Sequence, residues 1–294
     1  MDQNLIAVIV GIVEGLTEFL PVSSTGHMII VANMLGLDEG IAHVFEVFVK
    51  LGAILSVIFI YKERFNRFFT KEGWQVDKGL SVWHVAAGIV PVMLVAFFLY
   101  DYIKEYLFGP LTVIYALVAG ALLLIYAEHK TKDKQDELVQ DIDKITIKQA
   151  FWVGVYQFLS LWPGFSRSGS TIAGGLLVGL SREVAAHFTF LIAVPLMFVA
   201  CTYDLLKNLY LLTADDLQIL AIGFVTAFVV AYWSVLWFLK FLHKTFILPF
   251  HKQSILRLGS GGFTDNSRRP LPSGQFRHQR RRIWAVAPVV CEGA

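Results

Sequence analysis

The sequence predicts an all-α integral membrane protein, built as an inverted-topology repeat with two re-entrant helical hairpins and about five transmembrane helices. Three observations predict this fold class. Of the 294 residues, 56% are hydrophobic and only 16% are charged, against about 25% charged in soluble domains. Long apolar runs almost free of charge recur along the chain. Two further apolar runs, each broken by polar residues, resemble one another in register.

The first apolar run, residues 5–37, is interrupted near its middle. It contains Glu14, Glu18, Pro21, a Ser-Ser-Thr run and His27. Polar backbone at membrane depth is tolerated only where it is buried in protein or lines a wet cavity. We therefore expect two short helices joined by a polar break, which together form a re-entrant hairpin. Residues 149–180, interrupted by Pro163-Gly164 and Arg167, predict a second hairpin of the same kind.

Charge-poor runs of about 20 residues predict the transmembrane helices. One run, residues 41–61, contains Glu46 and Lys50, whose spacing lets them pair across one helix face. The other four runs are residues 80–100, 106–127, 184–203 and 217–239.

Lysine and arginine predict the orientation. The segments 62–78 and 130–148 each hold five of them, and the chain from Lys240 onward is basic, so these parts are expected in the cytoplasm. The first hairpin then opens from the outer side and the second from the cytoplasm. The basic residues concentrate in the tail, and no nucleic-acid partner is expected.

A shift of 143 residues superposes the two hairpins without a gap, with nine identities over residues 11–45. We expect a first repeat at 1–128 and a second at 149–250. A cytoplasmic loop, 129–148, joins them, and a basic, disordered tail follows at 251–294. Inverted repeats with broken helices place the functional site where the breaks meet.

The first break carries a candidate cation site. Glu14 and Glu18 are one helical turn apart, and two carboxylates this close repel unless a proton or cation lies between them. A divalent ion, Mg²⁺ or Ca²⁺, would suit these oxygen ligands. The alternative is a pair of glutamates at a solvated helix end.

The same break carries a candidate nucleophile. Ser23 or Ser24 can cap the next helix, whose N-terminus favours anions. Ser24 and His27 are three residues apart, the spacing of a nucleophile beside its base. The alternatives are mere capping for the serines and a core histidine for His27.

The second break carries a candidate anion site. Arg167, flanked by Ser166 and Ser168 at another helix start, can bind an oxyanion through two hydrogen bonds. The alternative is a structural ion pair with one of the glutamates. Together, the two breaks predict an anionic ligand, a phosphate or diphosphate.

Residues 14–27 and 163–169 resemble the signature regions of the undecaprenyl-diphosphate phosphatase family, also called bacitracin resistance protein. The likeness covers roughly residues 5–250 and includes residues 45–47 and 193–195. It implies a hydrolase of the bacterial inner (plasma) membrane that faces the periplasmic side. The enzyme would convert undecaprenyl diphosphate to undecaprenyl phosphate, recycle the carrier for peptidoglycan synthesis and confer bacitracin resistance, with a divalent cation.

The resemblance also implies roles for individual residues. The catalytic residues would be Glu14, Glu18, Ser24, His27 and Arg167, of which Glu14 and Glu18 would bind the metal. Ser23, Thr25, Ser166 and Ser168 would bind the polyprenyl diphosphate. Whether Ser24 or water attacks, and whether the chain forms a homodimer, stays open.

Two features depart from the family. Lys50 stands where an uncharged polar residue is usual, and no apolar span follows residue 249, where the family would have one more. A different class, a secondary transporter of an anionic or lipid-phosphate substrate, also uses inverted repeats with broken helices. A transporter, however, does not need Ser24 beside His27.

Overall fold

The computed structural model describes residues 2–35, 39–107, 110–208 and 216–259. Regular structure in these ranges is helical, apart from one isolated parallel bridge between Val139 and Leu180. Four helical segments are long and apolar enough to cross a membrane, and a bent fifth makes up to five. The predicted class, an all-helical multi-span membrane protein, is confirmed.

The first half begins with two short helices and continues with three longer ones and the short α4. They are α1 (Gln3–Thr17), α2 (Ser24–Leu35), α3 (Glu39–Ile60), α4 (Lys62–Phe68), α5 (Val82–Tyr106) and α6 (Pro110–Thr131). The short 3₁₀ helices η1 (Lys71–Trp74) and η2 (Val76–Lys78) follow α4. An 85° bend separates the apolar part of α3 from α4.

The second half follows a connecting segment that contains η3 (Lys132–Glu137) and η4 (Ile142–Lys144), and it too begins with a pair of short helices around a break. Its elements are α7 (Ile147–Tyr156), η5 (Gln157–Leu161), α8 (Arg167–Leu177), α9 (Arg182–Asn208) and α10 (Asp216–Gly259). Each predicted hairpin is thus two helices around a break. Their re-entrant course in a membrane stays a prediction. Residues 251–259, predicted to begin a disordered tail, are instead helical as the end of α10, and residues 260–294 lie outside the described residues.

The two breaks share an uncommon backbone conformation. Ser23 and Ser166, which correspond under the 143-residue shift, both have φ of +63°, and no other described residue except glycine has a positive φ. Each hydroxyl accepts a hydrogen bond from the amide three residues on, at 3.5 Å from Gly26 and 3.2 Å from Gly169. A positive φ is unfavourable for a residue with a Cβ. Its recurrence at equivalent positions agrees with the internal repeat.

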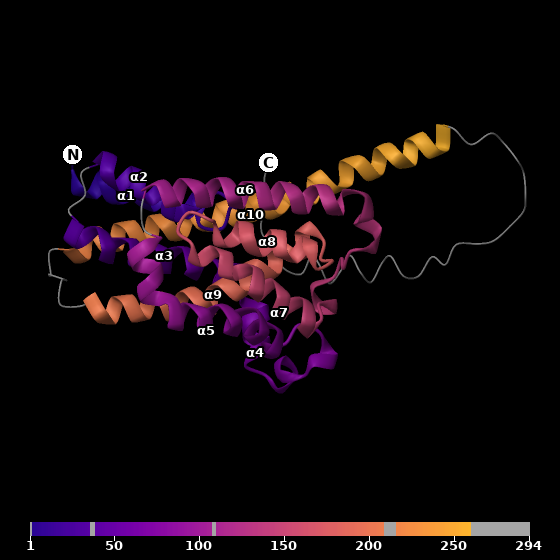
Figure 1. The fold of residues 1–294 in the computed structure, drawn as a ribbon, viewed down its shortest axis with the longest axis horizontal. Coiled ribbons are helices and arrows are strands. Elements are labelled where there is room, and N and C mark those ends of the chain that lie inside the picture. The colour runs from indigo at the N-terminus through magenta and orange to yellow at the C-terminus, as the bar shows by residue number, and fades with distance from the viewer. Residues whose placement is uncertain (1, 36–38, 108–109, 209–215, 260–294) are drawn as a thin grey trace, which may run out of the picture. The chain divides into compact units, whose positions relative to one another are not determined.

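The first helix of each hairpin packs against a helix of the other half. A Cβ on Gly11 of α1 would lie 2.8 Å from the carbonyl oxygen of Gly223 in α10, and one on Gly154 of α7 would lie 2.6 Å from that of Gly88 in α5. Figure 1 shows α7 beside α5. Because glycine lets the backbones approach closely, these equivalent positions join the two halves.

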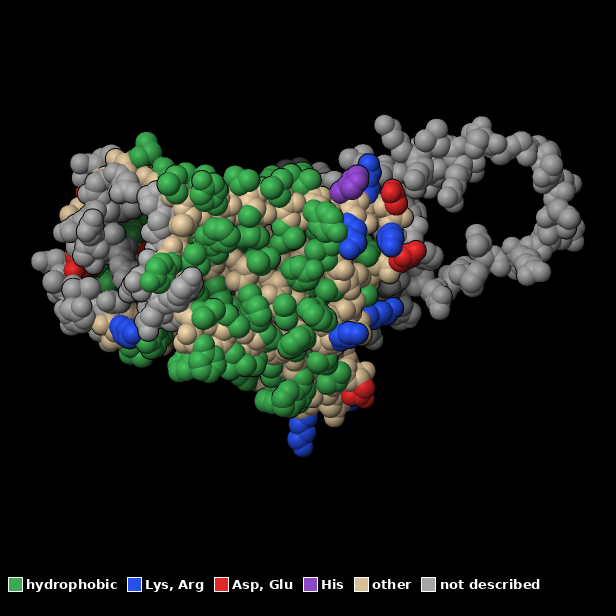
Figure 2. Space-filling view, viewed as in Figure 1, with side chains coloured by type: hydrophobic (Ala, Val, Ile, Leu, Met, Phe, Trp, Pro, Cys, Tyr) green, Lys and Arg blue, Asp and Glu red, His purple; other side chains and the backbone are tan. Residues whose placement is uncertain are grey.

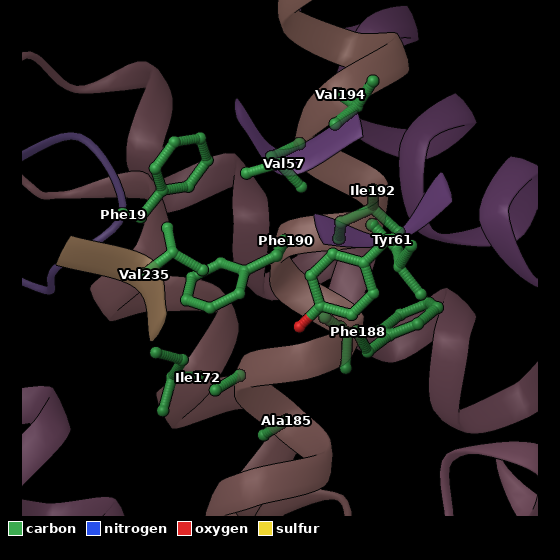
Figure 3. Packing of buried hydrophobic residues seen from close by; sticks show 14 of the residues in the cluster. Phe19, Val57, Tyr61, Ile172, Ala185, Phe188, Phe190, Ile192, Val194 and Val235 are labelled. Atoms are coloured by element: carbon green, nitrogen blue, oxygen red, sulfur yellow. The ribbon is translucent and has the colours of Figure 1, made fainter. Parts of the chain in front are cut away.

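Aromatic side chains hold the first break against α9. Phe19, two residues after the end of α1, is fully buried and meets Phe190 edge to face, with ring centroids 5.5 Å apart (Figure 3). The core therefore fixes the break that carries Glu18.

On the outside, hydrophobic side chains cover the middle of the face in Figure 2, as expected for contact with lipid, and Lys and Arg gather toward one end.

Candidate active site

The two breaks meet at a cavity of about 490 Å³. Seven of the nine predicted site residues line it. They are Glu18, Ser23, Ser24, Thr25, Ser166, Arg167 and Ser168. The other two, Glu14 and His27, are not among the lining residues. A direct bond joins the breaks, because the Ser168 hydroxyl donates to the carbonyl of Leu20 at 2.7 Å.

Glu18 connects the two candidate reactive groups. Its side chain is 6% exposed, and its carboxylate accepts a hydrogen bond from the Ser24 hydroxyl at 2.5 Å and one from Arg167 Nη2 at 2.9 Å. Because a charge-assisted hydrogen bond is short and strong, Glu18 fixes the positions of both partners. The structure thus contains the ion pair that sequence reasoning weighed as the alternative for Arg167.

That ion pair leaves Arg167 able to bind a ligand. Its second terminal nitrogen, Nη1, is buried and has no hydrogen-bond partner in the structure. A guanidinium presents donors in a fixed fork, so one arm is held by Glu18 while the other remains available. An oxyanion in the cavity would accept a hydrogen bond from this donor. Without such a partner, a buried N–H group costs free energy.

His27 does not occupy the predicted position beside the nucleophile. The Ser24 hydroxyl donates to Glu18 instead, and His27 is exposed, with its ring Nδ1 donating to the carbonyl of Ser23 at 2.9 Å. The expected Ser24–His27 pair is therefore wrong for this structure. The reason is that Glu18, held by Arg167, accepts the bond from the Ser24 hydroxyl, while His27 bonds to the backbone carbonyl of Ser23 at the start of α2.

Glu14 is completely buried, and neither carboxylate oxygen has a hydrogen-bond partner. An ionised carboxylate is costly in such a place unless a counter-charge is near, so these free oxygens suit a cation. The described residues hold no group of three or more His, Cys, Asp or Glu able to bind a metal ion. Mg²⁺, however, commonly uses one or two carboxylates together with water and substrate phosphates. Glu14 and Glu18 fit that pattern.

Three further elements, α3, η5 and α9, contribute lining residues. Glu46 and Lys50 of α3 form the predicted ion pair, and both face the cavity. Ser160 and Asp204 also line it and were missed as site residues. A signal for Asp204 was present, because Met197, Ala200, Cys201 and Asp204 follow helical spacing on one face of α9 and all line the cavity.

The arrangement is suited to an anionic group that undergoes phosphoryl transfer. Two helix N-termini, at Ser24 and Arg167, begin at the cavity, and such ends favour phosphates. Ser24 supplies a hydroxyl already bonded to a carboxylate, which is how a serine nucleophile is activated. Arg167 supplies positive charge for the transferred group.

Comparisons with known proteins agree with this chemistry. "Undecaprenyl-diphosphatase 1" of Bacillus thuringiensis (strain Al Hakam) is 44% identical to this chain over 257 residues, which cover 87% of this chain and 96% of the relative. The family model described as bacitracin resistance protein BacA matches residues 7–259. Because that match covers most of the chain and both breaks, the chain belongs to the bacitracin resistance protein BacA family.

Proposed function

We propose that this chain hydrolyses undecaprenyl diphosphate to undecaprenyl phosphate and inorganic phosphate. The observation that carries the proposal is Glu18, buried at the cavity and bonded to both the Ser24 hydroxyl and Arg167. The printed name of the Bacillus relative supports the substrate. A carboxylate–serine pair beside an arginine serves phosphoryl transfer, whereas a transport site has no need of a nucleophile.

The cavity groups divide into binding and reacting parts. The free arm of Arg167 and the N-termini of α2 and α8 would bind phosphoryl oxygens. The hydroxyls that would bind the rest of the diphosphate are Ser23, Thr25, Ser166 and Ser168, all of which line the cavity. Substrate would thus be held at the meeting point of the two breaks.

Ser24 is the proposed nucleophile. Its oxygen would attack the terminal phosphorus while its proton passes to Glu18, and the bridging P–O bond would break to release undecaprenyl phosphate. Water would then attack the phosphoserine, giving inorganic phosphate and free Ser24. In the direct route, water attacks the same phosphorus and Ser24 only binds it.

Glu14 and Glu18 would hold the divalent cation, Mg²⁺ or Ca²⁺. When bound, such an ion neutralises phosphate charge and polarises the phosphoryl oxygens. Glu18 faces the cavity, but both of its oxygens already have protein partners, while those of Glu14 have none.

The proposed location is the bacterial plasma (inner) membrane, with the cavity on the outer, periplasmic side. The lysine-rich and arginine-rich segments 62–78 and 130–148 favour a cytoplasmic position for the opposite end. At the outer side, the enzyme would return the lipid carrier to peptidoglycan synthesis. Removing the diphosphate form would also confer the bacitracin resistance after which the family is named.

Phosphate release from a prenyl diphosphate by the purified chain in detergent tests the proposal, because transport is impossible there. We expect Arg167→Ala and Glu18→Ala each to lower the rate by about 10²–10³, a common effect of removing one charge-stabilising group. Arg182→Ala is the matched control, since Arg182 pairs with Glu128 and does not line the cavity. No phosphate release by the unaltered chain, or near-normal rates in both cavity variants, would contradict the proposal.

A further inference from the structure

A second cation, Lys50, faces the cavity from α3. It forms an ion pair with Glu46, and its side chain is 21% exposed. It lines the same cavity as Glu18, whose backbone amide donates to the carbonyl of Glu14 one helical turn earlier, at 2.9 Å. Lys50 therefore lies within the electric field of the same two residues that would hold the divalent cation.

The surrounding charges are unequal. Arg167 pairs with Glu18, and Lys50 pairs with Glu46, so each of these carboxylates has a cation of its own. Glu14 has none, because it is fully buried and both of its oxygens lack hydrogen-bond partners. A buried carboxylate without compensation is costly. Lys50, which faces the cavity that Glu18 also lines, is a positive charge that the chain itself provides to this group of carboxylates.

We propose that Lys50 is a permanent positive charge of this site, attracted to the same carboxylates as the divalent ion, those of Glu14, Glu18 and Glu46. Lys50 thereby weakens the binding of the divalent ion and lowers the enzyme's requirement for that ion. The inference rests on the proposed function only in that catalysis uses the cation. An ammonium group and a divalent ion near the same carboxylates repel one another. The unaltered chain should therefore bind the ion weakly and retain turnover when little of it is present.

Replacing Lys50 by an uncharged residue should reverse both properties. Even at the dielectric constant of water, a unit charge about 6 Å away changes the affinity for a divalent ion about tenfold. Lys50→Gln should therefore bind Mg²⁺ or Mn²⁺ at least about tenfold more tightly than the unaltered chain. Without the ion it should lose most of its activity, because nothing then offsets the charge of Glu14.

The test titrates the purified full chain in detergent with Mg²⁺ and with Mn²⁺, and follows the thermal unfolding midpoint, which reports binding without turnover. We expect the half-saturating concentration to fall about tenfold or more in Lys50→Gln and in Lys50→Met. Lys50→Arg keeps the charge and should titrate like the unaltered chain. So should Lys71→Gln, an exposed lysine outside the cavity. Phosphate release is then measured with a chelator and with increasing Mg²⁺ in each variant.

Equal or weaker cation binding in Lys50→Gln and Lys50→Met would overturn the inference. If neither variant folds, Glu46→Gln replaces them. It leaves Lys50 without its partner and should weaken cation binding about tenfold, so unchanged binding there would overturn the inference. The two proposals fail separately. If the unaltered chain releases no phosphate, the proposed function is wrong, whereas the midpoint titrations still report on Lys50.

Discussion

At the scale of single residues, Glu18 explains why two distant breaks form one site. Its two oxygens bind groups from different halves, Ser24 of its own break and Arg167, which lies 149 residues away in the chain. Displacing either partner changes the environment of the other. The nucleophile and the phosphate-binding charge are therefore coupled through one carboxylate.

This coupling predicts unequal effects of Ser24→Ala and His27→Ala on phosphate release. Ser24→Ala removes the hydroxyl bonded to Glu18 and should lower the rate by about 10²–10³, or more if the serine attacks. His27→Ala removes an exposed ring bonded to the carbonyl of Ser23 and should cost less. Rates are measured on purified variants at saturating substrate.

Trapping a phosphoserine at Ser24 in rapidly quenched reactions would establish the covalent route. Retention of measurable turnover in Ser24→Ala, with no trapped phosphoserine, would favour attack by water instead. A larger loss in His27→Ala than in Ser24→Ala would contradict the geometry, because it would require His27 to act on the reacting group.

Much of the site could be predicted from sequence at this scale. Glu18, Ser23, Ser24 and Arg167 were expected to converge, and the cavity brings them together. The hydrogen-bond partner of Ser24 could not be predicted, because local spacing allows His27 as well as Glu18. The choice is made by Arg167, which fixes the Glu18 carboxylate from a break far away in sequence.

At the scale of elements, close approach through glycine holds the hairpins in place. A Cβ at position 154 would meet the carbonyl oxygen of Gly88 at 2.6 Å, whereas one at position 26 would meet its nearest atom at an ordinary 3.6 Å. The first distance requires α7 and α5 to move apart. The second requires no movement.

We therefore expect Gly154→Ala to lower the thermal unfolding midpoint in detergent, through overpacking that typically costs about 1–3 kcal/mol. Gly26→Ala is the matched control, and its midpoint should stay the same or rise, because alanine favours the helix by about 1 kcal/mol over glycine. Tryptophan fluorescence during heating measures both. An unchanged midpoint in Gly154→Ala would mean that α5 and α7 are not in the close contact described.

Hydropathy located the long helices but missed α4. The charge of residues 62–78 predicts a cytoplasmic segment without a span, yet residues 62–68 are helical and follow an 85° bend. Phe65 and Phe68 pack partly buried against the core while Lys62 and Glu63 are exposed. This spacing is an amphipathic signal, but seven residues are too few for a hydropathy window to detect.

The segments that join these elements are held together by Asp143. Its carboxylate accepts hydrogen bonds from Arg64 of α4 at 2.5 Å and from the amide of Leu80 at 3.0 Å. Burial alone would raise the pKa of Asp143, but the hydrogen bond and charge of Arg64, with help from Leu80 and Arg67, hold that pKa below its ordinary value. The ionised form therefore stabilises the fold.

The lowered pKa of Asp143 determines how the stability of the protein depends on pH. A carboxyl whose pKa is lower in the folded state stabilises the protein above its unfolded pKa, about 3.9 for aspartate, and loses that contribution as the pH falls through the folded pKa. Asp143→Asn should thus lower the unfolding midpoint at pH 7, and the difference should shrink as the pH falls below the unfolded pKa and through the lower folded pKa. Asp77→Asn, at an exposed site, is the control. A difference that persists unchanged in acid would show that charge is not the cause.

At the scale of the whole molecule, the cavity lies toward one end of the long helices. Ser23, Ser24 and Thr25 approach it from the first break, and Asp204 approaches it from near the C-terminal end of α9. The segment that includes this end of α9, residues 204–216, contains a single Lys or Arg, Lys207. The segment that follows α3, residues 62–78, contains five Lys and Arg residues. The orientation of the protein therefore decides which side of the membrane supplies the substrate.

Positive charge favours residues 62–78 in the cytoplasm and the cavity outside. The prediction is tested with Lys71→Cys and Leu206→Cys, both at exposed positions, in a Cys291→Ser background where Cys201 stays buried. A membrane-impermeant thiol reagent should label Leu206→Cys in intact cells and Lys71→Cys only after permeabilisation. The Cys291→Ser protein without an added cysteine is the control, because any labelling of it comes from Cys201. The reverse pattern would place the cavity on the cytoplasmic side, where it could not act on diphosphate carrier released at the outer face.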